Sequence, residues 1–193
     1  MKNTDDQHII DLVKKGHIQS YSILVDRYKN MIYSLCFKMI KNKEEAEEAA
    51  QDSFIKAFKN IDKFKNESKF STWLYKVAYN TCLDSLKKIN KTQHVELVES
   101  YASNHYKRED SIAGFLADDL QEQIIQNCLS QLPGDENLII TLFYFEELSI
   151  EEISEIINLK PNNIKVKLHR IRKKLALLLK DKLESNYEYL RKL

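Results

Sequence analysis

The stretch LSIEEISEIINLKPNNIKVKLHRIRKKL at residues 148–175 predicts two helices joined by a tight turn. Ser149 and Glu152 have the spacing of a capping box, in which the N-cap hydroxyl and the acid three residues later each satisfy a backbone N–H at the helix start. Asn158 can take the left-handed conformation that ends a helix, and Pro161 suits the first position of the next helix, where its missing N–H costs nothing. The pattern therefore indicates a short helix, a turn and a longer helix.

The longer helix is expected to have one apolar stripe and positively charged side chains on its other faces. Ile164, Leu168 and Ile171 recur at spacings of four and three, which places them on one face. Residues 160–174 hold seven Lys or Arg and no acid, whereas residues 135–155 hold seven acids and no Lys or Arg. A face this positive favours the binding of a polyanion, and a helix fits the major groove of duplex DNA. The pattern is typical of a helix-turn-helix, and a solvated basic helix of an ordinary bundle is the less favoured alternative.

The candidate DNA-binding side chains of this helix fall into two groups. Asn162, Asn163 and Lys165 lie in the first turns, which usually reach base edges. The second group is placed to meet phosphates and comprises Lys165, Lys167, His169, Arg170, Arg172, Lys173 and Lys174. Arginine can form bidentate hydrogen bonds with guanine, whereas lysine acts as a point charge. Arg170 and Arg172 are therefore the favoured specificity residues.

The composition places the chain among helical globular proteins. Its 193 residues are 43% hydrophobic and carry 30 Lys+Arg against 29 Asp+Glu, so one or two domains with hydrophobic cores are expected. Three glycines and two prolines are too few for the many tight turns of a β-sandwich or barrel. We therefore expect an all-α fold.

Several classes of protein are disfavoured by missing motifs. The three cysteines form no CxxC pair, which argues against a disulfide framework and against a zinc cluster. No apolar run approaches the ~20 residues of a membrane span, and the first ten residues are not those of a signal peptide, so a cytoplasmic protein is expected. The five histidines accompany no HExxH, GxSxG or Gly-rich phosphate loop. We expect no enzymatic activity, no cofactor and no metal.

Charge and periodicity divide the chain into three parts. Residues 1–88 show helical periodicity and carry 16 basic and 12 acidic side chains. Residues 89–118 have poor periodicity and an excess of acids, so a flexible acidic linker is the simplest interpretation. Residues 119–193 resume the helical pattern after this break. We expect two small helical domains joined by the linker.

A polar loop interrupts the first part. Residues 63–70, KFKNESKF, combine lysines with Phe64 and Phe70 between two helical segments. Ser71 or Thr72 is expected to cap the helix that follows. Closing the edge of the core is the simplest role for the two rings.

Two stretches resemble conserved regions of bacterial sigma factors. Residues 148–175 resemble the fourth conserved region, and residues 42–88, with EEAEEAAQDSFIKAF and STWLYKVAYNTCLDSLKK, resemble the second region of the extracytoplasmic-function class. The two occur in the family's order, and a linker replaces the third region, as in that class. The resemblance implies a sigma factor that directs core RNA polymerase to promoters. Residues 1–88 would be its region two and residues 119–193 its region four.

The resemblance assigns residues in the first part to two tasks. For docking onto the clamp helices of the largest catalytic subunit it implies Glu48, Gln51 and Asp52. Melted promoter strands near minus ten are held by aromatic stacking, basic backbone contacts and amide groups. For this second task the implied residues are Lys56, Lys59, Asn60, Lys63, Phe64, Lys65, Asn66, Lys69, Phe70, Lys76 and Asn80. Trp73 is expected to belong to the core.

The basic helix would read the duplex element near minus thirty-five. By resemblance Val166 joins Lys165, Lys167, Arg170 and Arg172 in this task, and it stands where the family usually has Ser. An apolar contact to a thymine methyl would replace a hydroxyl contact, so the preference for that base pair is expected to differ.

Core RNA polymerase and promoter DNA are the partners that the resemblance implies. Members of the class usually act as monomers, and many are held by an anti-sigma factor. The alternative is a stand-alone helix-turn-helix regulator whose first part binds a ligand or forms a dimer. Such a protein has no need for the basic aromatic loop, which argues against this alternative.

Overall fold

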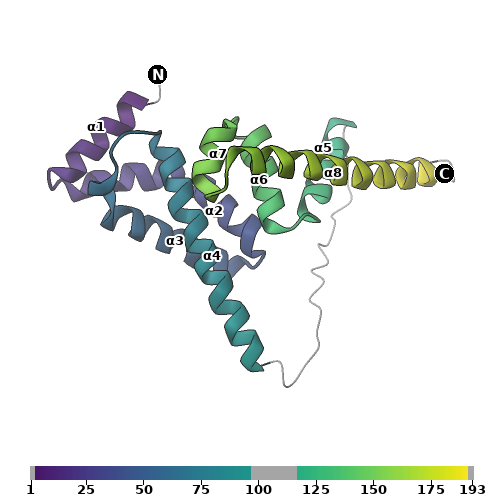
Figure 1. The fold of residues 1–193 in the computed structure, drawn as a ribbon, viewed down its shortest axis with the longest axis horizontal. Coiled ribbons are helices and arrows are strands. Elements are labelled where there is room, and N and C mark those ends of the chain that lie inside the picture. Colours follow the sequence, from purple (N-terminus) through teal and green to yellow (C-terminus); the bar gives the residue numbers. More distant parts are fainter. Residues whose placement is uncertain (1–2, 97–116, 191–193) are drawn as a thin grey trace.

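The computed structural model describes residues 3–96 and 117–190, which are helical with short connections and contain no strand (Figure 1). The predicted all-α class is therefore confirmed. The eight α-helices of this described part are α1 (Asn3–Lys14), α2 (Tyr21–Ile40), α3 (Lys43–Lys59), α4 (Phe70–Glu96), α5 (Ala117–Ser130), α6 (Gly134–Tyr144), α7 (Ile150–Ile157) and α8 (Pro161–Leu190). Two 3₁₀ turns, η1 (Ile18–Ser20) and η2 (Ile61–Lys63), lie between them.

Helices α1 to α4 form the first bundle, and polar side chains hold its helices in register. The hydroxyl of Tyr21 on α2 donates to the carbonyl of Phe54 on α3 at 2.8 Å. On α1, the buried carboxylate of Asp6 accepts hydrogen bonds from Arg27 and Tyr28 of α2. Burial, followed by the hydrogen bond to Asp6, raises the pKa of Tyr28, which keeps its hydroxyl protonated as a donor.

Helices α5 to α8 form the second bundle, with the predicted helix-turn-helix at α7 and α8. Ser149 Oγ accepts from the backbone N–H of Glu152, and the Glu152 carboxylate accepts from Ser149 N, so the capping box is confirmed. Asn158 ends α7 with φ 58°, in the left-handed region, and Pro161 begins α8. Inside the bundle, the buried amide of Asn137 donates to the carbonyl of Leu129 at 2.6 Å and ties α6 to α5.

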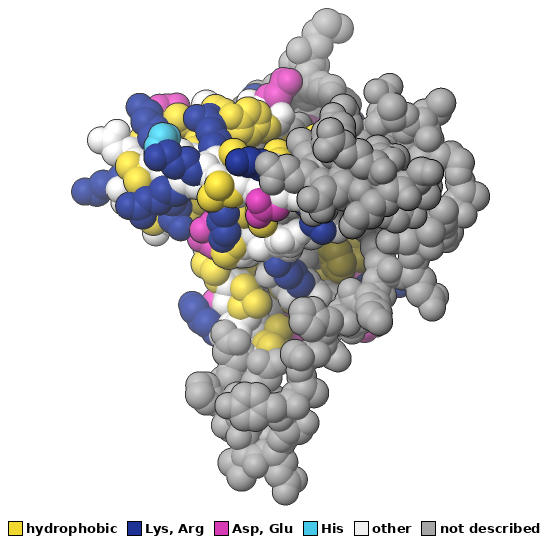
Figure 2. Space-filling model, turned by 90° about the vertical axis from the view of Figure 1, so that its right-hand side faces the viewer, with side chains coloured by type: hydrophobic (Ala, Val, Ile, Leu, Met, Phe, Trp, Pro, Cys, Tyr) yellow, Lys and Arg dark blue, Asp and Glu magenta, His cyan; other side chains and the backbone are white. Residues whose placement is uncertain are grey.

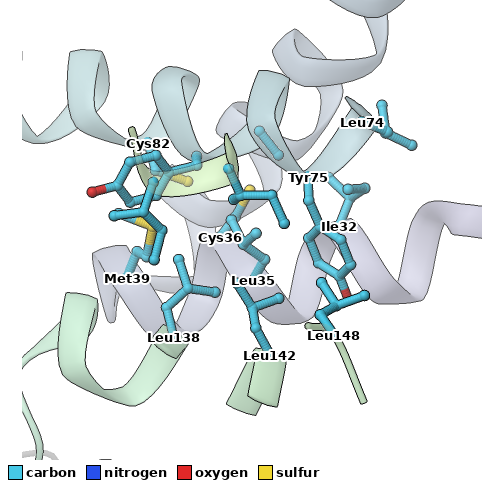
Figure 3. Packing of buried hydrophobic residues seen from close by; sticks show 14 of the residues in the cluster. Ile32, Leu35, Cys36, Met39, Leu74, Tyr75, Cys82, Leu138, Leu142 and Leu148 are labelled. Atoms are coloured by element: carbon cyan, nitrogen blue, oxygen red, sulfur yellow. The ribbon is translucent and has the colours of Figure 1, made fainter. Parts of the chain in front are cut away.

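The two bundles pack directly against each other. Helix α6 lies on α2, and α7 lies on α4 (Figure 1). Figure 3 shows Leu138 and Leu142 of α6 pointing at Met39 and Leu35 of α2, with Leu148 beside Tyr75 of α4. All are buried, so one continuous hydrophobic core spans both bundles.

Some of the helix boundaries expected from the sequence differ from those in the structure. Ser71 and Thr72 were predicted to cap the fourth helix, which is wrong, because α4 begins at Phe70 and places both in its first turn. Helix α4 also continues to Glu96, into the segment 89–118 that the sequence predicts as a linker. Residues 97–116 of that linker lie outside the described residues. The C-terminal segment extends α8 to Leu190.

Ser149→Ala is expected to lower the free energy of unfolding by about 1 kcal/mol, because it removes the hydroxyl that accepts the Glu152 N–H. Urea denaturation followed by circular dichroism measures the change. Ser22→Ala, on the exposed first turn of α2, is the matched control and should stay within ~0.5 kcal/mol of the parent. Equal stabilities for Ser149→Ala and the parent would contradict the importance of the capping box.

Candidate nucleic-acid interface

The outward face of α8 is the side opposite its buried stripe of Ile164, Leu168 and Ile171. At 3.6 residues per turn, that face lies near Val166 and Lys173, and Val166 is 49% exposed. The other exposed candidates around this face are Asn162, Asn163, Lys165, His169 and Arg170. The structure therefore brings most of the predicted duplex-binding residues onto one accessible surface.

Lysines on one flank of α8 are paired within the domain. Lys167 Nζ lies 2.9 Å from a carboxylate oxygen of Asp135, and Lys174 Nζ lies 3.1 Å from one of Glu136. Both acids belong to the first turn of α6. These pairs hold the basic helix against α6 and partly neutralise two of its charges.

Arg172 lies apart from the outward face. Its Nε donates to the hydroxyl of Tyr144 at 2.8 Å, and its guanidinium carbon is 5.5 Å from the ring centroids of both Phe143 and Tyr144. Cation–π contact of this kind favours the observed position. Of the two predicted specificity residues, Arg170 therefore lies near the outward face, whereas Arg172 is held against Phe143 and Tyr144.

A cluster of aromatic rings lies beneath the predicted minus-ten surface. Phe64 and Phe70 are 4% and 1% exposed, and their rings lie 5.6 Å apart in edge-to-face contact. Trp73 packs on both, and Tyr28 of α2 lies 5.7 Å from Phe70. The two phenylalanines thus support the loop from beneath, and Trp73 packs against the core as expected.

Polar groups form the accessible part of this surface. The exposed candidates are Lys59, Lys63, Lys65, Asn66, Lys69, Lys76 and Asn80. Lys56 and Asn60 are half-buried: Lys56 Nζ donates to Thr81 at 3.3 Å, and the Asn60 amide donates to the Lys56 carbonyl at 2.8 Å. Lys14 of α1 donates to the Phe64 carbonyl at 2.8 Å and fixes the start of the loop. Figure 2 faces the other bundle, at the end of the molecule where α8 lies, and in that view Lys and Arg side chains gather on one side.

The predicted polymerase-binding residues share the outer side of α3. Glu48 and Gln51 are exposed, and Asp52 is half-buried. Ile55, one turn after Gln51, is 50% exposed and was not predicted. An apolar residue at the fourth position after Gln51 was the available sequence signal, but single exposed apolar residues are common on surfaces.

An apolar groove in the second bundle was also missed by sequence reasoning. It has a volume of about 370 Å³ and lies between α5, α6 and α8, with Ile125, Ile140, Tyr144, Phe145 and Leu175 among its lining residues. Tyr144 and Phe145 are 52% and 55% exposed. Hydrophobic periodicity alone assigns such residues to a core. The groove can be recognised only from the arrangement of the three helices.

Glu152 connects the helix-turn-helix to the predicted minus-ten surface. Besides capping α7, its carboxylate lies 3.7 Å from Lys69 Nζ and 3.5 Å from the hydroxyl of Thr72. Burial alone would raise its pKa, but the hydrogen bonds from Ser149 and the charge of Lys69 outweigh burial and leave the pKa below its usual value. The carboxylate is therefore ionised at neutral pH.

Within residues 3–96 and 117–190, no group of three His, Cys, Asp or Glu side chains is arranged to hold a metal ion. None of the helices in the described part of the chain combines the length and apolar character of a membrane span.

Comparison with known proteins matches both bundles to one family. The model for Sigma-70 region 2 matches residues 24–92, and the model for Sigma-70 region 4 matches residues 122–175. Two solved structures share the fold. The sigma factor RpoE of Bartonella quintana, in complex with the anti-sigma factor NepR, has a TM-score of 0.67 at 20% identity over 84% of this chain and 98% of that one. CnrH, in complex with the cytosolic domain of CnrY, has a TM-score of 0.61 at 18% identity over 91% and 97%.

Curated relatives extend the match along most of the chain. The sequence is 35% identical to ECF RNA polymerase sigma factor SigW of Bacillus subtilis, over 89% of this chain and 95% of the relative. It is 30% identical to ECF RNA polymerase sigma-E factor of Haemophilus influenzae, over 86% and 91%. With its two bundles matched in the order of regions two and four, the chain belongs to the extracytoplasmic-function family of RNA polymerase sigma factors.

Proposed function

We propose that this chain binds core RNA polymerase and directs it to promoters without catalysing a reaction itself. The observation that carries the proposal is the joint presence, on one chain of this family, of an outward basic helix in a capped helix-turn-helix and a second basic surface on the other bundle. Polymerase supplies the chemistry, so the chain's own contribution is binding and positioning. A cytoplasmic location and a monomeric state accord with this role.

The two bundles divide the work in this proposal. Residues 1–88 act as region two: Glu48, Gln51 and Asp52 meet the polymerase clamp. The exposed lysines around the loop contact the opened strand near minus ten, and Asn80 reads a flipped base. Residues 119–193 act as region four, in which Asn162, Val166 and Arg170 meet base edges near minus thirty-five. Residues 89–118 connect the two regions.

An anti-sigma factor is proposed as a further partner. The RpoE relative of known structure is held by the anti-sigma factor NepR, and this chain shares its fold. A regulator of that kind would keep the protein from polymerase until it is needed. Co-purification from the host, followed by mass spectrometry, identifies such a partner directly.

Promoter-directed transcription in vitro with bacterial core polymerase tests the proposal. The parent is expected to give specific transcripts that core polymerase alone does not give. Asn80→Ala is expected to lower transcript yield by about tenfold, because it removes one edge-reading contact to an unstacked base, worth about 1–3 kcal/mol.

The matched control for Asn80→Ala removes a side-chain amide at another exposed position. Asn30 is exposed on α2 and belongs to no candidate surface, so Asn30→Ala should transcribe like the parent. Permanganate footprinting of unpaired thymines separates loss of strand opening from loss of duplex binding. Binding to duplex operators without polymerase, together with no transcript from any core enzyme, would instead support the stand-alone regulator.

A further inference from the structure

The loop that carries much of the predicted minus-ten surface lies outside regular secondary structure. Residues 64–69 belong to no helix, and Asn66 has a φ of 61°, in the left-handed region. Lys65, Asn66 and Lys69 of this loop are exposed. Because a helix does not satisfy the polar groups of this backbone, its shape depends on contacts with neighbouring segments.

Helix α1 supports the start of the loop. It lies against η2 and α4 (Figure 1). In its last turn, the ammonium of Lys14 donates to the carbonyl of Phe64 at 2.8 Å, across 50 positions of sequence. Phe64 is the residue at which the chain leaves η2, and a hydrogen bond from a charged donor is stronger than a neutral one. Lys14 therefore holds the backbone where the loop begins.

Helix α1 is itself held against the first bundle along its length. Its buried apolar residues are Ile9, Ile10 and Val13. One turn before Ile10, Asp6 is 5% exposed and accepts hydrogen bonds from Arg27 and Tyr28 of α2. The ring of Tyr28 lies 5.7 Å from that of Phe70, where the loop ends and α4 begins. Contacts of α1 thus reach both ends of the loop, directly at Phe64 and through Tyr28 at Phe70.

A loop that is ordered in advance binds a strand at lower cost. Ordering of a flexible segment on binding consumes part of the interaction free energy, so preorganisation raises affinity without any new contact. While Lys14 holds the Phe64 carbonyl, the loop keeps one arrangement before the strand arrives. Without this hydrogen bond the loop samples other arrangements, and DNA binding has to restore the first.

We propose that Lys14 is a positioning residue for minus-ten recognition, which holds the loop from α1 without touching the promoter strand. This inference rests on the proposed function, because it concerns how one of the two DNA surfaces keeps its shape. Helix α1 precedes residues 24–92, which match the region 2 model, and none of its residues was predicted to serve DNA binding. The proposal adds this helix to the recognition apparatus.

Lys14→Met tests the hydrogen bond in the full chain, because methionine keeps most of the aliphatic side chain and lacks the ammonium. Limited digestion with trypsin, followed by mass spectrometry, reports on the loop, since Lys65 and Lys69 are cleavage sites within it. Initial cleavage at these two sites is expected to accelerate about fivefold, the equivalent of ~1 kcal/mol for one lost hydrogen bond.

Two further variants control for charge and for folding. Lys15→Met makes the same change at the next residue, which is also exposed, and its loop should be cleaved like that of the parent. Lys14→Arg keeps a cationic donor and should restore slow cleavage. Circular dichroism should show the helix content of the parent in all three variants.

Promoter preference separates positioning from general stability. Transcription is compared on a promoter with an intact minus-ten element and on one in which the flipped base is replaced. General destabilisation lowers both yields alike, whereas a displaced loop lowers the first yield more than the second. The ratio of the two yields is expected to fall about fivefold for Lys14→Met and to return for Lys14→Arg.

Several results would overturn the positioning role. Cleavage of Lys14→Met at the rate of the parent would do so, and a reduced ratio at that rate would show that Lys14 contacts the strand directly. Faster cleavage with an unchanged ratio would show that the hydrogen bond has no part in recognition. Equal effects of Lys14→Met and Lys15→Met would attribute them to charge alone. Absence of transcript from the parent would refute the proposed function separately, since the cleavage measurement needs no DNA.

Discussion

Phe70→Ala is expected to lower the free energy of unfolding by about 3–5 kcal/mol, a large part of the ~5–15 kcal/mol that holds most domains. Phe70 is 1% exposed and its ring contacts Tyr28, Phe64 and Trp73, so truncation leaves a cavity in an aromatic cluster that cannot readily collapse. Urea denaturation monitored by Trp73 fluorescence and circular dichroism measures the loss. The first bundle should unfold at markedly lower denaturant concentration.

Phe70→Leu distinguishes support of the core from stacking on DNA. Leucine refills most of the cavity, so stability should return toward that of the parent, whereas a stacking partner would still be absent. If Phe70 acts only beneath the loop, Phe70→Leu transcribes nearly as well as the parent. A stable Phe70→Leu protein that binds duplex DNA but fails to open promoters would show that the ring leaves the core to stack on a base. A Phe70→Ala protein of unchanged stability would contradict the buried position itself.

Arg170→Ala is expected to weaken promoter recognition at the minus-thirty-five element by about 5- to 150-fold, the equivalent of 1–3 kcal/mol for a bidentate contact to a base. Arg170 is exposed near the outward face of α8, two residues from the buried Leu168. Transcription is measured on promoters with an intact and with a scrambled minus-thirty-five element. The defect should be large on the first and small on the second.

Lys174→Ala is the matched control, because it removes one positive charge from the same helix. Lys174 Nζ lies 3.1 Å from Glu136, so its charge is already paired within the domain. Its removal should change affinity only slightly and equally on both promoters. Equal losses for Arg170→Ala and Lys174→Ala would show that the helix binds through net charge alone.

Local sequence determined the helix-turn-helix and the all-α class. The capping box at Ser149 and Glu152, the left-handed Asn158 and the start of α8 at Pro161 all involve groups within a few residues of one another. Such interactions depend on spacing along the chain, so spacing was enough to predict them. The helices of the first bundle followed from apolar periodicity in the same way, although the start of α4 did not.

Tertiary structure decided which predicted residues are accessible. Phe64 lies before α4 and Phe70 begins it, and the rings of Tyr28 on α2 and Trp73 on α4 pack against them. Arg172 lies two residues from Arg170, but Tyr144 of α6 engages it. The position of each of these side chains depends on a partner that is distant in sequence or lies on another helix. The sequence around the side chain does not indicate which partner it will meet.

The sequence by itself thus determined the fold class, the helix-turn-helix and the family, because these rest on local periodicity and on motifs. Only the tertiary structure decided that the two bundles share one core. The approach of Gly134 to Met39 and the pairing of Glu152 with Lys69 join residues more than 80 positions apart. Their proximity is set by how whole helices pack, which no short stretch of sequence specifies.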